Sequence, residues 1–202
     1  MKFRNIIWCL LAVLALVSCK EEDDVVEEFV NWQGTNDAYF SNLVSEVQSG
    51  ARATTPNKWE VLPCYSLPEI GYTLNYYDYV VVEKLNQGSG TTSPLQTDSV
   101  EVHYAGRLLP SLSYPQGYQF DSSFSGTFDP GLDTPAKFWA GGLVKGFTTA
   151  LVHMHRGDRW RIYIPYQLAY GSTARTSVPA YSTLIFDLQL EDFWRKTKGD
   201  RE

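Results

Sequence analysis

Between residues 78 and 194, apolar and polar side chains alternate as in strands that bury one face. An apolar run, Tyr79-Val80-Val81-Val82, predicts a first strand, and a Gly/Ser/Thr-rich loop follows over 87–94. Three later segments each place their apolar side chains on a single face. These faces are formed by Val100, Val102 and Tyr104, by Trp160, Ile162 and Ile164, and by Leu184, Phe186, Leu188 and Leu190.

One segment between these strands has the spacing of a helix. Phe147, Ala150, Leu151 and Met154 recur at the intervals that form one apolar helical face, and Gly157 is expected to end the helix. Several antiparallel strands with one helix predict an α+β domain over 78–194, an antiparallel sheet wrapped around a short helix.

The preceding segment, 25–77, is expected to be a helical and irregular extension. Gly34-Thr35-Asn36 should interrupt a helix over 25–48, with Thr35 or Asn36 capping a second piece, and the prolines of 51–77 predict an irregular connection. The apolar side chains of the helix would pack on the main domain or on a second copy, as a homodimer. They are Phe29, Trp32, Phe40, Leu43, Val44 and Val47.

The first 18 residues form a basic start and an apolar run, which predicts a signal peptide. Leu16-Val17-Ser18-Cys19 resembles a bacterial lipobox, so Cys19 is expected to be lipidated; the alternative is ordinary secretion. Residues 19–24 would be an acidic tether, or an address for surface export. The expected location is the outer membrane, through a lipid anchor, on the cell surface or the periplasmic face.

Net charge and cysteine content limit the kinds of partner, disulfide and metal site that we expect. Loss of residues 1–18 leaves 15 basic and 23 acidic side chains, a net charge of -8, which disfavours a nucleic-acid partner. Cys64 would be the only thiol besides Cys19, so neither an internal disulfide nor a cysteine-rich metal site is expected. Residues 195–202 form a charged tail.

Five short motifs in the predicted domain occur in one order. They are Val102-His103-Tyr104-Ala105-Gly106, Phe120-Asp121-Ser122-Ser123, Val144-Lys145-Gly146-Phe147, Ala169-Tyr170-Gly171, and Val178-Pro179 leading to Leu184-Ile185-Phe186-Asp187. In this order they resemble the FK506-binding (FKBP-type) peptidyl-prolyl cis/trans isomerases. The resemblance implies an FKBP-like fold, proline-containing polypeptide substrates, and a role in the folding of exported proteins.

The resemblance also implies a site that works without a cofactor or a metal. Phe147 would be the floor for the proline ring, Tyr170 would donate its hydroxyl to a substrate carbonyl, and Asp121 would be a polar partner at the rim. An alternative is that Asp121 only hydrogen-bonds Tyr104 or backbone groups. The implied catalytic residues are Tyr104, Phe120, Asp121, Tyr170 and Phe186, and the substrate-binding residues are Leu143, Val144, Phe147 and Val178.

Some positions depart from the family pattern. Ala136 stands where an aromatic residue is expected, and Phe128 is a candidate to replace it from a shifted loop. Arg175 occupies the tip of a loop that usually carries an apolar residue or His. These departures favour an alternative function, a catalytically weak chaperone or binding module. His103 is expected at a surface position of its strand, because it faces away from Tyr104.

Overall fold

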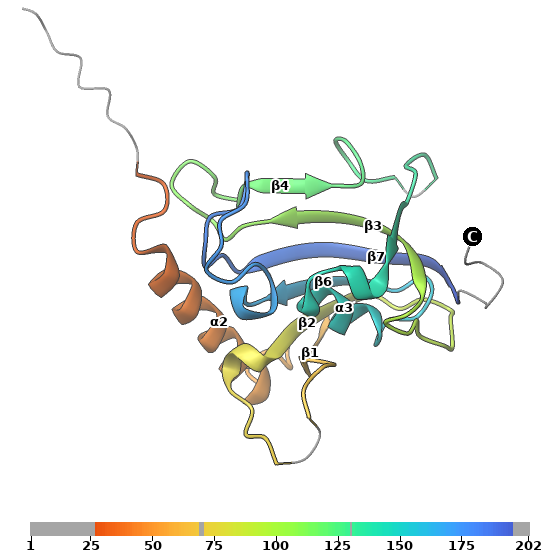
Figure 1. The fold of residues 1–202 in the computed structure, drawn as a ribbon, viewed down its shortest axis with the longest axis horizontal. Helices are drawn as coiled ribbons and strands as arrows, with labels where there is room; N and C mark the ends of the chain where they lie inside the picture. Colours follow the sequence, from red (N-terminus) through yellow and green to blue (C-terminus); the bar gives the residue numbers. More distant parts are fainter. Residues whose placement is uncertain (1–26, 69–70, 130, 196–202) are drawn as a thin grey trace, which may run out of the picture.

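The computed structural model describes residues 27–68, 71–129 and 131–195. The predicted fold class is confirmed: an antiparallel sheet wraps around a short helix, and a further helix precedes it (Figure 1). The predicted signal peptide, Cys19, the acidic tether and most of the charged tail lie outside the described residues. The elements are α2 (Trp32–Gln48), β1 (Lys58–Pro63), β2 (Tyr79–Asn86), β3 (Ser99–Arg107), β4 (Gln119–Ser122), β5 (Ala136–Trp139), α3 (Lys145–Leu151), β6 (Arg159–Ile164) and β7 (Leu184–Trp194), with 3₁₀ turns at Tyr76–Asp78, Ala140–Gly142 and Tyr166–Leu168.

Within the described residues, the sheet has seven strands in the order β1-β2-β6-β7-β3-β4, and β5 pairs with β3. All of the pairings are antiparallel. Strand β3 pairs with β7 along one side, while β4 and β5 share its other side. Its polar-apolar alternation turns Val100, Val102 and Tyr104 to one face, where all three are buried.

Helix α3 packs across this inner face of the sheet, in front of β6 and β2 in Figure 1. Gly146 permits the close approach, because a Cβ there would lie 2.2 Å from Ile164 Cγ2. The helix ends at Leu151, earlier than the expected end at Gly157. Met154 nevertheless stays fully buried in the core.

Helix α2 is a single helix from Trp32 to Gln48, so the expected interruption at 34–36 is wrong. Asn36 is fully buried, and its side-chain amide donates to Trp32 O at 2.7 Å. Its carbonyl oxygen accepts a hydrogen bond from Thr183 N at 2.7 Å. These tertiary bonds satisfy a polar side chain that local sequence favours as a helix start.

The segment 51–77 is not irregular throughout, because Lys58–Pro63 forms strand β1 and pairs with β2. The sheet therefore begins before the boundary expected at residue 78. Pro63 is the last residue of this edge strand, a place where a missing backbone N–H is tolerated.

Apolar side chains from Phe40 onward in α2 cover the outer face of the sheet, whereas Trp32 joins the main core. Phe40, Leu43 and Val44 are buried against Val81 of β2 and Tyr163 of β6. The helix thus packs on its own main domain, one of the two arrangements expected from the sequence. A homodimer through the extension would have to use other residues. Among the described helices, none is both long and apolar enough to cross a membrane.

Candidate functional site

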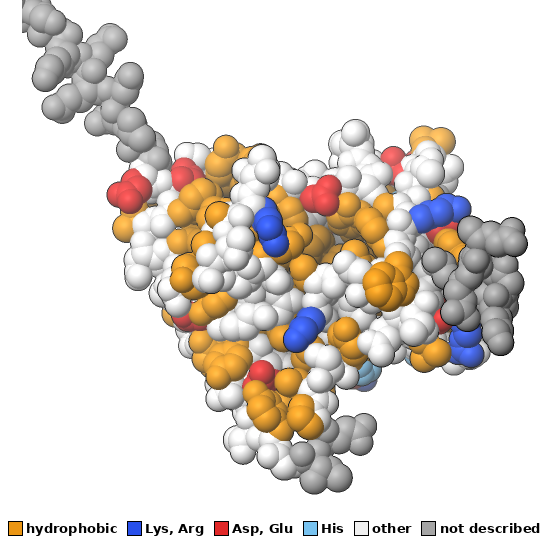
Figure 2. Space-filling view, in the orientation of Figure 1, with side chains coloured by type: hydrophobic (Ala, Val, Ile, Leu, Met, Phe, Trp, Pro, Cys, Tyr) orange, Lys and Arg blue, Asp and Glu red, His pale blue; other side chains and the backbone are white. Residues whose placement is uncertain are grey.

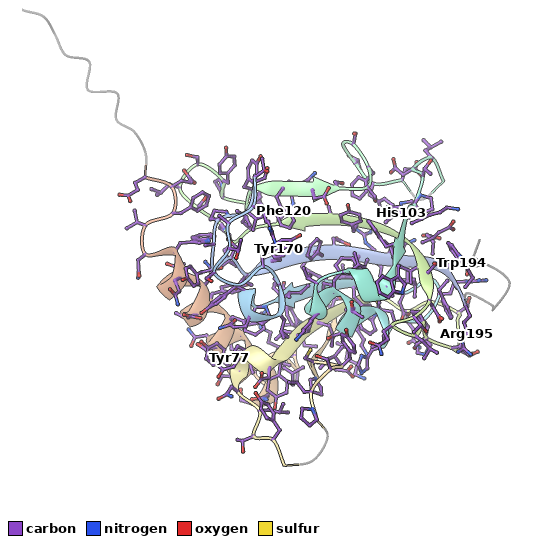
Figure 3. All side chains as sticks on the ribbon, in the orientation of Figure 1. Tyr77, His103, Phe120, Tyr170, Trp194 and Arg195 are labelled. Carbon is purple, nitrogen blue, oxygen red and sulfur yellow. The ribbon has the colours of Figure 1, made fainter. Side chains whose placement is uncertain are left out.

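A cavity of about 210 Å³ opens on the inner face of the sheet beside α3. Figure 2 shows hydrophobic side chains gathered in a hollow on this side of the molecule. In Figure 3, Phe120 of β4 and Tyr170 of the turn after β6 lie near one another. The lining residues are Tyr104, Phe120, Asp121, Phe138, Gly142, Leu143, Val144, Phe147, Tyr170 and Phe186.

Phe186 is the centre of the aromatic wall. Its ring centroid lies 5.0 Å from that of Phe147 and 5.5 Å from that of Phe120, both edge to face. Tyr104 lies 6.2 Å from Phe186 and 6.3 Å from Phe147. These separations and angles are favourable for aromatic pairs, so the rings hold each other in place around the cavity.

The space for these rings depends on Gly106 in β3. A Cβ at this position would lie 2.6 Å from both Phe120 Cζ and Phe186 Cε1. Because such distances are below van der Waals contact, any larger residue would push one of the two rings away from its position.

One hydrogen bond links the polar groups of the cavity. The hydroxyl of Tyr104 donates to Asp121 Oδ2 at 2.9 Å. Asp121 Oδ1 also accepts from Ser122 N at 2.9 Å, and the Asp121 side chain is exposed at the rim. Burial, followed by the bond to Asp121, raises the pKa of Tyr104 above its ordinary value. Tyr104 therefore remains a neutral donor at physiological pH.

Ser123, a residue without a predicted role, fixes the backbone of Tyr104. Tyr104 N donates to Ser123 Oγ at 2.9 Å, and Ser123 N donates to Tyr104 O at 2.9 Å. Its presence in the Phe120-Asp121-Ser122-Ser123 motif was the available signal.

The structure brings together eight of the nine residues predicted for catalysis and substrate binding. Val178 is the exception. It is buried and faces a second hollow of about 370 Å³, which Phe29, Tyr118 and Pro179 also line. The guanidinium of Arg175 lies 5.2 Å from the ring centroid of Tyr170, so the loop carrying Val178 still borders the cavity.

Phe138 supplies the aromatic side chain that was expected at Ala136. Its ring lies 5.8 Å from that of Tyr104. Strand β5 alternates, so Ala136 and Phe138 share the inner face, and this alternation was the signal that could have identified Phe138.

Phe128 does not replace the missing aromatic residue. It packs on the outer face, with its ring centroid 4.9 Å from that of His103. His103 is therefore buried, with 3% exposure, and the expected surface position is wrong. Neighbouring residues of a strand point to opposite faces, which separates Phe128 from the cavity beside Tyr104. In the described part of the chain, no three or more His, Cys, Asp or Glu side chains are grouped to hold a metal ion.

Comparisons with known proteins agree with this architecture. Residues 90–191 match the family described as FKBP-type peptidyl-prolyl cis-trans isomerase. The chain is 37% identical over 139 residues to the macrophage infectivity potentiator of Trypanosoma cruzi, covering 61% of this chain and 65% of that protein. It is 39% identical over 107 residues to the FKBP-type 22 kDa peptidyl-prolyl cis-trans isomerase of Escherichia coli, covering 52% and 46%.

Solved structures show the same fold. The crystal structure of FkpA from Escherichia coli aligns with a TM-score of 0.52 and 24% identity, over 82% of this chain and 64% of that one. The chain belongs to the FKBP-type peptidyl-prolyl cis-trans isomerase family. It spans less than two thirds of the length of the curated relatives described above.

Proposed function

We propose that this protein is an active peptidyl-prolyl cis/trans isomerase that assists the folding of exported proteins. The observation that carries the proposal is the cavity itself. Aromatic side chains from β3, β4, β5, α3 and β7 enclose it, while Tyr104, Asp121 and Tyr170 bring polar groups to it. An apolar floor with a few convergent polar groups suits a proline ring and its flanking carbonyls.

The reaction requires rotation about an amide bond, and no bond is made or broken. The barrier of about 18–20 kcal/mol comes from amide resonance. At the twisted geometry that resonance is lost, together with much of the carbonyl dipole. A dry aromatic cavity disfavours the planar, polar ground state relative to the twisted state, and fixed hydrogen bonds hold the twisted geometry. Each ~1.4 kcal/mol removed from the barrier gives about tenfold in rate.

We propose the residue roles that the family resemblance implies, and the positions of the side chains support them. Phe147, held against Phe186, receives the proline ring. Tyr170 is half-buried and donates its hydroxyl to a carbonyl of the substrate. Asp121 lies at the rim as the polar partner near the rotating bond, and its contacts with Tyr104 and Ser122 N hold it there.

The proposal is tested with the 20–202 fragment and a panel of peptides that differ in the residue before proline. Since Leu143 and Val144 present an apolar wall, peptides with Leu or Phe before proline should react faster than those with Glu. A wild-type rate equal to the spontaneous rate would refute the enzyme and favour a chaperone or binding module. A flat or reversed preference would contradict the assignment of the wall.

We further propose that the chain is exported and anchored through Cys19, which follows an apolar run and a small residue. Two or more acyl chains hold a protein firmly on a membrane, whereas one holds it marginally. In the native host, Cys19→Ser should remove the protein from the lipoprotein pool. Labelling of the variant with fatty acid at the wild-type level would contradict the anchor.

The acidic run that follows Cys19 is proposed to direct the domain to the cell surface, because four consecutive acids exceed the needs of a spacer. Replacing Glu21 to Asp24 by Ala should protect the protein from protease added to whole cells, while wild type is cut. Equal protection of both would place the domain on the periplasmic face and reduce the run to a solvated tether.

A further inference from the structure

The loop over residues 171–183 follows Tyr170 and borders the cavity. Tyr181 N donates to Gly171 O at 2.9 Å, which closes the base of the loop. At its tip, Arg175 N donates to Val178 O at 2.8 Å. Residues 172–176, which lead from the base of the loop into its tip, are exposed. A loop of this kind is mobile unless its ends are fixed, because few buried contacts restrain it.

Helix α2 fixes the end where the loop enters β7. Trp32 Nε1 donates to Ser182 Oγ at 2.8 Å, and Ser182 Oγ donates to Pro179 O at 2.7 Å. One turn later, Asn36 Oδ1 accepts from Thr183 N at 2.7 Å. Water cannot readily replace these bonds, because the residues that form them are buried. They are Trp32, Asn36, Ser182 and Thr183.

The same helix contacts the other end of the loop. Gln33 Nε2 donates to the Tyr166 hydroxyl at 3.3 Å, and Gly171 N donates to Tyr166 O at 2.8 Å. The ring of Tyr166 packs edge to face on Tyr181 at 5.3 Å. Tyr170 therefore lies between two points that the first turns of α2 hold.

We infer that Trp32 and Asn36 are positioning residues for Tyr170, so that α2 is part of the isomerase site although it lies outside the family match at 90–191. The inference rests on the proposed function. Tyr170 donates usefully only if its hydroxyl keeps its distance to the substrate carbonyl, and small displacements of such groups lower rates severely. By fixing both ends of 171–183, the helix restricts the movement of Tyr170.

Trp32→Phe tests the inference, because it keeps an aromatic ring while it removes the N–H donor, together with part of the ring volume. In the full chain without its signal peptide, we expect kcat/KM to fall about threefold to tenfold, mainly through kcat. Ser182→Ala should have a similar effect, and the double variant should resemble either single variant. In a Tyr170→Phe background, Trp32→Phe should cause little further loss, because the hydroxyl that it positions is already absent.

Leu43→Ala is the matched control. Leu43 is buried in the cluster on the outer face with Val81 and Tyr163. Its truncation should lower the urea midpoint of unfolding at least as much as Trp32→Phe does. Activity at a temperature where the chain is folded should remain that of wild type. An equal loss of activity in Leu43→Ala would reduce the effect of Trp32 to general stability and overturn the inference.

Amide hydrogen exchange gives a readout that does not depend on catalysis. Trp32→Phe should increase exchange selectively in 171–183, whereas Leu43→Ala should not favour this segment. Unchanged exchange in 171–183 would overturn the inference whether or not the chain is active. A wild-type chain without isomerase activity would refute the proposed function. A selective increase of amide exchange in 171–183 of Trp32→Phe would then still support the conclusion that α2 restrains this loop.

Discussion

The hydroxyl of Tyr104 donates a hydrogen bond to Asp121 Oδ2 at 2.9 Å, joining the buried centre of β3 to the exposed rim on β4. The bond has two consequences. It orients the carboxylate, and it raises the pKa of the phenol, after the larger effect of burial. These contacts are the ones expected of a carboxylate that fixes the loop, and a direct role of Asp121 near the rotating bond stays a prediction.

A double-mutant cycle separates these roles. Asp121→Asn keeps an acceptor for Tyr104 but removes the charge, and should lower kcat/KM about tenfold if the carboxylate acts near the rotating bond. Tyr104→Phe removes the hydrogen bond to the Asp121 carboxylate and should lower kcat/KM about threefold. The effects of the two substitutions should not be additive in the double variant. Full activity of Asp121→Asn in a peptide assay would limit Asp121 to fixing the loop.

Gly106→Ala should damage the cavity although Gly106 contributes no side chain. The added methyl group would lie 2.6 Å from atoms of Phe120 and Phe186, so one of the rings must move. We expect a stability loss of about 1–3 kcal/mol and a larger fractional loss of activity than stability alone explains. Urea unfolding and a peptide assay measure the two effects. Ala105→Gly, in the same strand but on its outer face, is the control. An equal loss of activity in Ala105→Gly would contradict the explanation that displaced cavity rings cause the loss.

Stability should depend on pH in the alkaline range. Burial, as the largest cause, raises the pKa of Tyr163 and of Tyr76 from 10.0 to about 12. Between these values the unfolded chain has released protons that the folded chain retains, so stability falls as pH rises. Below pH 10 the contribution is fully present. The urea midpoint should therefore be level up to about pH 10 and then decline. Tyr163→Phe should decline less steeply, and an identical decline would exclude Tyr163 as a source.

Removing a side chain of α2 should destabilise the whole domain. Phe40 is 1% exposed and packs on Val81 and Tyr163 of the sheet. Phe40→Ala should therefore cost about 3–5 kcal/mol. Thermal unfolding followed by far-UV and near-UV circular dichroism should show a single shifted transition. Two separate transitions would mean that α2 is a structural unit independent of the sheet.

The sequence predicted the strands and α3 because those features are local, whereas the cavity residues were expected from the resemblance of five motifs to the FKBP-type family. Alternation at Val100, Val102 and Tyr104 marks a strand wherever the strand pairs. The features that were missed depend on distant partners. Asn36 is a strong helix-start residue on its own, and only Thr183, far along the chain, makes it suitable for a helix interior.

The position of Phe128 was missed for a related reason. Periodicity cannot show which face of a sheet a loop will cover, and the loop carrying Phe128 covers His103 on the outer face. Strand β1 was likewise hidden by its flanking prolines, although an edge strand accommodates Pro63 at its end.

The most direct measurement compares wild type with Phe147→Ala in a protease-free assay, where NMR exchange reports the rate of X–Pro isomerisation. Phe147 is 4% exposed, its ring packs edge to face against Phe186, and it is the proposed floor for the proline ring. Leu43→Ala, which also removes a buried side chain, corrects for lost stability. We expect wild type to exceed the spontaneous rate and Leu43→Ala to have the same rate as wild type. Phe147→Ala should lose most of the acceleration. Equal rates for wild type and Phe147→Ala in folded protein would contradict the assignment of this cavity as the isomerase site.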